Sequence, residues 1–123
     1  MPRVRDFLKR NAMLARNRCF GQPGYPSLNI VIGNTSSDLD SCGGCLVLAW
    51  YLSVTSANNK VFLPIINCSK EEFKYKQEVT MHLNDHCGIP IEDLYFMDEF
   101  MKHYNTQLIE QTVLYDHNYL DSD

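Results

Sequence analysis

Residues 28–41 read LNIVIGNTSSDLDS, and this stretch decides the fold. Its first five residues, 28–32, form a β-branched apolar run that is typical of a central strand buried on both faces. The run ends in a polar turn over residues 33–37. The apolar segment that follows, residues 42–52, has the length of a buried helix. A strand, a polar turn and a helix in this order predict the first half of a βαβ unit.

Strand and helix signals alternate along the rest of the chain. Further strands are predicted over residues 61–66, 94–97 and 112–115, and a helix over residues 69–86. Strands that are separated by helical segments imply parallel pairing with crossover connections. We therefore predict an α/β fold with a parallel sheet flanked by helices. In such sheets functional groups collect at the carboxyl ends of the strands.

The first 27 residues differ from the remainder. Apolar residues at helical spacing predict an amphipathic helix over residues 4–16, followed by a linker rich in glycine and proline. We therefore divide the chain into residues 1–27, a helix and its linker, and residues 28–123, the beginning of the α/β domain. With no secretory signal and no apolar run near the roughly 20 residues of a membrane span, a cytoplasmic protein with no membrane partner is expected.

The charge of −4 is unevenly distributed. Six of the eleven basic residues fall in the first eighteen positions, so the remainder carries five basic and fourteen acidic residues. This surplus has the wrong sign for a nucleic-acid-binding surface, and no nucleic acid partner is expected. It has the right sign for divalent cations, if enough carboxylates converge.

Acidic residues follow three of the four predicted strands. They are Asp38 and Asp40 after the first strand, Asp98 and Glu99 after the third, and Asp116 with His117 and Asn118 after the fourth. Carboxylates at one rim of a sheet repel one another unless a cation neutralises them. Carboxylate oxygens with one imidazole suit Mn²⁺ or Mg²⁺, and an Asp-x-Asp pair can serve two neighbouring ions. Alternatively, Asp38 and Asp98 only cap the helices that they precede.

Residues 33–41 resemble the first motif of the DHH phosphoesterases, in the form found in eukaryotic exopolyphosphatases and prune proteins. That branch has asparagine where family II inorganic pyrophosphatases have a metal-binding histidine, and Asn34 occupies this position. Residues 62–67, 96–99 and 114–118 resemble further motifs of the same family, in the same order. The resemblance implies a Rossmann-like DHH domain.

The resemblance also implies a set of site residues. It makes Asp38, Asp40, Asp98 and His117 metal ligands, with Asp98 bridging two ions; it makes Asp116 the catalytic-site residue that orients His117, and places Asn34 and Asn118 against substrate phosphate. The implied activity is exopolyphosphatase- or pyrophosphatase-type hydrolysis of phosphoanhydride bonds, by water activated between two Mn²⁺ or Mg²⁺ ions. The implied substrate is inorganic polyphosphate or pyrophosphate.

Two features depart from the family pattern. Asn118 stands where the second histidine of the Asp-His-His motif is expected. The family's fourth motif and its C-terminal substrate-binding domain lie beyond Asp123. We therefore expect an N-terminal fragment that is short of metal ligands, so that catalysis by this chain alone is in question.

Two alternatives come from other functional classes. One is a non-catalytic protein-interaction module of prune type. The other is a dithiol redox protein, since Cys42 and Cys45 form a CxxC pair at a strand-to-helix turn. Against the redox alternative, Gly43 and Gly44 fit better as small residues that let a helix pack on the sheet.

Overall fold

The structure is a computed structural model that describes residues 3–34, 37–56, 60–104 and 109–115. Its three-stranded sheet consists of β1 (Leu28–Ile32), β2 (Val61–Ile65) and β3 (Ile109–Leu114). All pairings are parallel, and the strand order is β2-β1-β3. The predicted α/β class and parallel sheet are confirmed.

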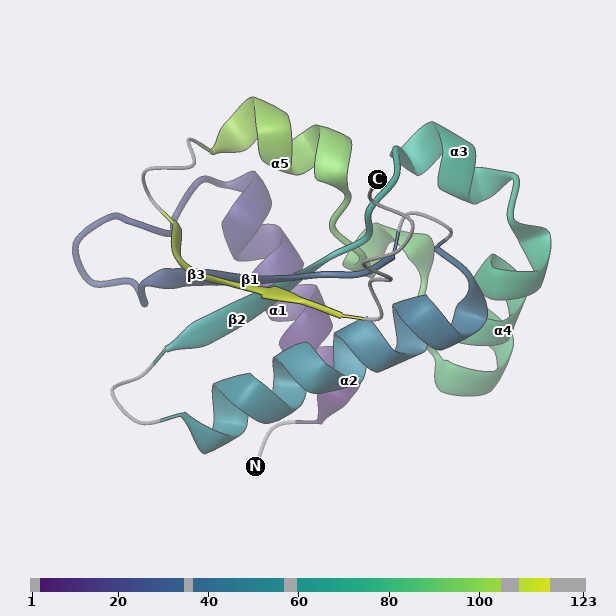
Figure 1. Ribbon diagram of the computed structural model, residues 1–123, viewed down its shortest axis with the longest axis horizontal. Coiled ribbons are helices and arrows are strands. Elements are labelled where there is room, and N and C mark those ends of the chain that lie inside the picture. Colours follow the sequence, from purple (N-terminus) through teal and green to yellow (C-terminus); the bar gives the residue numbers. More distant parts are fainter. Residues whose placement is uncertain (1–2, 35–36, 57–59, 105–108, 116–123) are drawn as a thin grey trace.

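Helices cover both faces of the sheet (Figure 1). The described helices are α1 (Val4–Arg16), α2 (Leu39–Thr55), α3 (Lys70–Lys74), α4 (Gln77–Cys87), the 3₁₀ turn η1 (Ile91–Asp93) and α5 (Met97–His103). In Figure 1, α2 lies below the sheet and α5 above it, while α3 and α4 lie at the right, toward which the strands run. None of the described helices is long and apolar enough to cross a membrane.

The core has two parts because the side chains of a strand alternate between its faces. Val31 of β1 and Phe62 of β2 join Leu46 of α2 in one cluster. Ile30 and Leu63 point the other way and pack in a second cluster, which includes Phe100 of α5. Four of the five residues of β1 are buried, as the apolar run predicted.

Residues 94–97 do not form the predicted strand. They make one parallel bridge beside β2, between Ile66 and Phe96, and α5 begins at the next residue. The Glu99 side chain accepts a hydrogen bond from the Phe96 backbone N–H at 3.2 Å. This bond belongs to a helix start, so the chain turns into α5 after one ladder contact.

The helix predicted over residues 69–86 is two helices, α3 and α4, with Tyr75 and Lys76 between them. Phe73 and Val79 are both buried in the same cluster. Six residues apart on a continuous helix, they would point in different directions. Breaking the helix between them lets both side chains enter the core.

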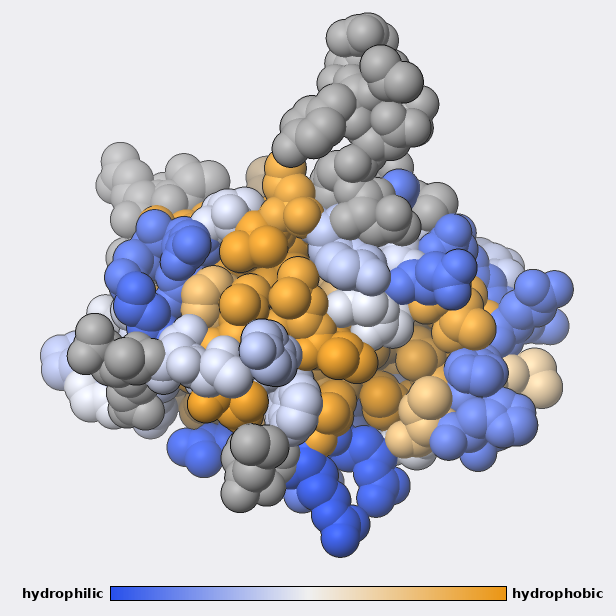
Figure 2. All heavy atoms as spheres, turned by 60° about the horizontal axis from the view of Figure 1, so that its bottom comes forward, coloured by the Kyte–Doolittle hydropathy of each residue, from blue (hydrophilic) through white to orange (hydrophobic). Residues whose placement is uncertain are grey.

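The outer face of α2 is apolar. Val47, Tyr51 and Leu114 of the neighbouring β3 are each more than half exposed. Figure 2 shows hydrophobic side chains gathered on this side of the molecule. A surface of this kind is common at protein–protein contacts.

Gly44 allows α2 to approach the end of β3, and Gly43 does not share this role. A Cβ at Gly44 would overlap the Tyr115 ring, whereas a Cβ at Gly43 would meet no atom within 4 Å. Gly43→Ala should therefore raise the free energy of unfolding, by up to about 1 kcal/mol from helix propensity. Gly44→Ala should lower it, because the Tyr115 ring must leave its place.

Urea denaturation of the two variants measures this difference, and Gly43→Ala is the matched control. Equal stabilities for the two variants would show that Tyr115 does not pack on α2.

Candidate metal centre

The turn between β1 and α2 carries the first pair of predicted ligands. Asp38 is the N-cap of α2, and its Oδ1 accepts a hydrogen bond from the Ser41 N–H at 2.9 Å. The capping alternative therefore describes Asp38 correctly. It does not exclude metal binding, because a carboxylate has two oxygens with about four lone-pair positions. Asp40 follows in the first turn of α2 and is exposed, like Asp38.

Ser41 holds this turn together, a role that the sequence analysis did not assign. Its side chain is buried, and its Oγ accepts a hydrogen bond from the Asn34 backbone N–H at 2.8 Å. Through its own N–H it also binds Asp38, so one residue fixes both ends of the turn. Ser37, between them, has a left-handed backbone with φ of 49° and donates its N–H to the Asn34 carbonyl.

Asp98 lies in the first turn of α5 and shows the clearest sign of a missing ligand. Two side-chain oxygens among the described residues are buried without a hydrogen-bond partner, Asn29 Oδ1 and Asp98 Oδ1. The asparagine is neutral, but the aspartate is a carboxylate, for which burial without a partner is costly. A divalent cation would satisfy this oxygen, so Asp98 fits a metal ligand.

Cys68 connects Asp98 with the β1–α2 turn. Burial raises the pKa of the Cys68 thiol, a side-chain hydrogen bond with Ser37 lowers it, and the nearby Asp98 carboxylate raises it further. Burial also raises the pKa of Cys42 to about 12, with smaller contributions from the Cys68 and Asp38 charges. Asp38 thus acts on Cys42 and Asp98 on Cys68, and Cys68 in turn acts on Cys42.

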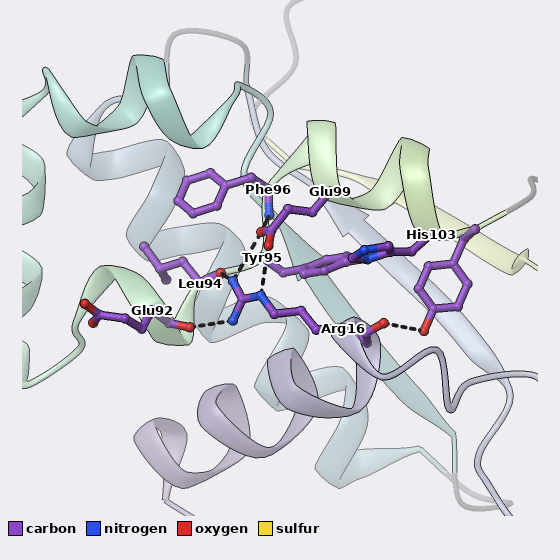
Figure 3. Close-up of polar contacts among 9 residues, drawn as sticks. Arg16, Glu92, Leu94, Tyr95, Phe96, Glu99 and His103 are labelled. Carbon is purple, nitrogen blue, oxygen red and sulfur yellow. Dashed lines mark hydrogen bonds and ion pairs between the residues drawn. The ribbon is translucent and has the colours of Figure 1, made fainter.

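Arg16 fixes the segment that carries Asp98 (Figure 3). Its Nε lies 2.8 Å from Glu99 Oε1, and its two Nη atoms donate to the backbone carbonyls of Glu92 and Leu94. The guanidinium also lies over the Tyr95 ring, 5.8 Å from its centroid. The end of α1 is thereby tied to both sides of the Asp98 turn. Sequence reasoning noted Glu99 only as an acid and gave Arg16 no partner.

The described residues do not complete the predicted ligand set. No group of three His, Cys, Asp or Glu side chains in residues 3–34, 37–56, 60–104 and 109–115 lies close enough to hold a metal ion. Asp116, His117 and Asn118 fall outside these ranges. Asp38, Asp40 and Asp98 as ligands therefore stay predictions, and so does the role of Asn34.

The geometry does not favour the dithiol alternative. Cys42 and Cys45 are buried free thiols, and their Sγ atoms donate to the carbonyls of Ser37 and Val31 at 3.3 and 3.4 Å. Burial raises the pKa of each thiol to about 12. Disulfide exchange needs a thiolate, and these surroundings disfavour it.

A Rossmann-like α/β domain with an acidic turn after its central strand is the class that the fold defines. No family model matches the chain. It is 35% identical over 94 residues to human exopolyphosphatase PRUNE1, 34% identical over 94 residues to bovine PRUNE1, and 32% identical over 96 residues to a putative exopolyphosphatase of Schizosaccharomyces pombe. These alignments cover 76–78% of this chain.

The chain belongs to the exopolyphosphatase and prune branch, as the motifs predicted, and the DHH resemblance is consistent with this branch. It spans 20–24% of the length of these relatives.

We predict that Ser41→Ala destabilises the protein by about 1–3 kcal/mol, because it removes the acceptor that the part-buried Asn34 N–H has in the Ser41 hydroxyl. Urea denaturation measures the change. Thr55→Ala is the control, since it removes an exposed hydroxyl from the other end of the same helix. A Ser41→Ala effect as small as the control's would mean that the turn does not depend on this bond.

The Arg16–Glu99 pair predicts a dependence of stability on pH. Partial burial alone would raise the pKa of Glu99, but the hydrogen bond and charge of Arg16 outweigh it and hold the pKa below its ordinary value. A lowered carboxyl pKa stabilises the folded state above the ordinary glutamate pKa of about 4.3, and this stabilisation is lost as the pH falls through the lowered pKa.

Glu99→Gln should therefore lower the free energy of unfolding near neutral pH, by about 1–3 kcal/mol, and by progressively less in acid. Denaturation curves across this pH range measure the difference. Glu71→Gln is the control, because Glu71 is exposed in its pair with Lys74. A Glu99→Gln difference that stays constant with pH would contradict the assignment.

Proposed function

We propose that the acidic strand-end surface holds Mn²⁺ or Mg²⁺ and serves metal-dependent hydrolysis of phosphoanhydride bonds. The observation that carries the proposal is the buried, unpaired Oδ1 of Asp98. The relatives support the reaction class, since they are named exopolyphosphatases. The proposed substrate is inorganic polyphosphate or pyrophosphate.

Four residues would hold the metal: Asp38, Asp40, Asp98 and His117, with two ions in the complete site and Asp98 between them. Bound divalent ions supply an acidified water as nucleophile and neutralise charge that develops on the phosphate oxygens. Asp116 would orient His117, and Asn34 and Asn118 would donate hydrogen bonds to phosphate.

The described residues hold two of the proposed ligands, Asp38 and Asp98, by contacts of their own. The Ser41 N–H holds one oxygen of Asp38. Arg16 binds the backbone carbonyls of Glu92 and Leu94 before Asp98 and the side-chain carboxylate of Glu99 after it. Residues that are already held in this way lose less conformational entropy when an ion binds to them.

A second candidate function is that of a protein-interaction module. The exposed apolar residues on α2 and β3, among them Val47, Tyr51 and Leu114, favour it. A partner with a complementary apolar surface would bury them. This function requires no bound metal, so metal binding discriminates between the two candidates.

We predict that Asp98→Ala changes stability in opposite directions with and without Mn²⁺. In metal-free buffer the variant should be at least as stable as the unmodified protein, because it removes a buried carboxylate oxygen that has no partner. With Mn²⁺ present only the unmodified protein should gain stability, since a ligand that binds the folded state stabilises it. Thermal unfolding with EDTA and with Mn²⁺ measures both effects, and Asp85→Ala on the exposed side of α4 is the control.

Phosphate release from polyphosphate and pyrophosphate with Mn²⁺ then tests the reaction itself. Metal-dependent release that is lost in the Asp38→Ala, Asp40→Ala double variant would support hydrolysis by this chain. Mn²⁺ binding without release would support a metal site that needs further residues. No Mn²⁺ binding would overturn the proposed hydrolase and favour the interaction module.

A further inference from the structure

A cavity of about 450 Å³ lies beside the β1–α2 turn, on the side of the α3–α4 break. Its described lining consists of Asp38, Tyr75, Lys76, Gln77, Glu78 and Val79. The cavity thus brings a predicted metal ligand, Asp38, next to a basic side chain from a segment almost forty positions further along the chain.

Lys76 and the proposed ligand Asp38 line the same cavity. The positive charge of Lys76 lowers the pKa of Cys42 and of Cys68, in both cases against a larger raising effect of burial. The Asp38 carboxylate also acts on Cys42, and the Asp98 carboxylate on Cys68. Lys76 therefore shares the cavity with Asp38 and acts on one thiol beside each of the two proposed ligands.

The backbone at Lys76 is held in place by the helix break. Its N–H donates to the Phe73 carbonyl at 2.9 Å, and its own carbonyl accepts from the N–H groups of Val79 and Thr80, at 3.1 Å each. The break arises because Phe73 and Val79 are both buried in the core. The packing that ends α3 thus also places Lys76 in the lining of the same cavity as Asp38.

The charges of the cavity indicate what it can bind. Among the described lining residues, Asp38 and Glu78 against Lys76 give a formal charge of −1, which does not attract an anion. A divalent cation on Asp38 adds two positive charges, so the sum becomes +1, and the ion is then the largest local charge. An anion is therefore expected to bind only after the metal, and Lys76 becomes its protein contact.

We propose that this cavity is a phosphate subsite and that Lys76 binds a phosphoryl oxygen of the polyphosphate or pyrophosphate chain. The inference rests on the proposed function, since the subsite needs the metal beside it. A lysine ammonium is a common point-charge partner of phosphate. Lys76 adds a substrate-binding residue to Asn34 and Asn118, the two that the resemblance implies.

The test uses Mn²⁺ and imidodiphosphate, a pyrophosphate analogue whose P–N–P bridge resists hydrolysis. Calorimetry measures first the Kd of Mn²⁺ and then, at saturating Mn²⁺, the Kd of imidodiphosphate. Lys76→Gln should leave the Mn²⁺ affinity unchanged and weaken imidodiphosphate binding by about tenfold, as expected for a lost charge-assisted hydrogen bond. Lys76→Arg should restore most of the affinity.

Lys74→Gln is the matched control. Lys74 lies two residues away, does not line the cavity, and pairs with Glu71 on the exposed side of α3. Lys74→Gln should change the Kd of imidodiphosphate by less than about twofold, since solvent screening weakens the effect of a distant exposed charge.

The outcomes separate the subsite from the function on which it rests. If the unmodified protein binds both ligands and the two variants, Lys76→Gln and Lys74→Gln, bind imidodiphosphate with the same Kd, the proposed subsite is wrong and the proposed metal centre stands. Binding of Mn²⁺ without imidodiphosphate also overturns the subsite. Failure to bind Mn²⁺ overturns the proposed function and the subsite together.

Discussion

The central position of β1 constrains everything else in the described structure. Because β1 pairs in parallel with both β2 and β3, the carboxyl ends of all three strands lie at one edge of the sheet. The backbone groups that leave β1 at this edge need partners, since buried polar groups without hydrogen bonds are costly. Ser41 supplies one of them to Asn34. The short turn that results is also what places Asp38 at the start of α2.

Capping and metal binding are often treated as competing explanations of an aspartate at a helix start. In this turn the two are compatible, because the cap uses one oxygen of Asp38 and leaves the carboxylate charge in place. Asp98 discriminates better between helix capping and metal binding. Its Oδ1 is buried without a partner, so no capping role accounts for that oxygen. A carboxylate that serves only structure would be expected to have both oxygens bonded or solvated.

Local signals predicted the elements that local forces determine. The helix over residues 4–16, the strand over residues 28–32 and the parallel sheet follow from periodicity and alternation. The single bridge at Phe96 and the break at Lys76 do not follow from local signals, because each depends on contacts distant in sequence. Phe96 pairs with Ile66 at the edge of the sheet. The break lets Phe73 and Val79 both pack in a core cluster that other elements complete. Arg16 is the clearest case, since its partner Glu99 lies 83 positions away.

The same distinction explains what could be predicted of the site. Acidic residues after strands are visible in the sequence, because the strand order follows from the pattern and parallel strands share an edge. The place of the Lys76 ammonium is not visible in the sequence, because it depends on where the predicted helix over residues 69–86 breaks. The five basic residues after the first eighteen positions offer little positive charge for a polyanion, but the fold places Lys76 in the lining of the same cavity as Asp38. With two carboxylates in the same cavity, that single lysine cannot attract phosphate until a metal has neutralised part of the acid. The order of binding, cation before anion, is therefore a consequence of the charge balance of the cavity.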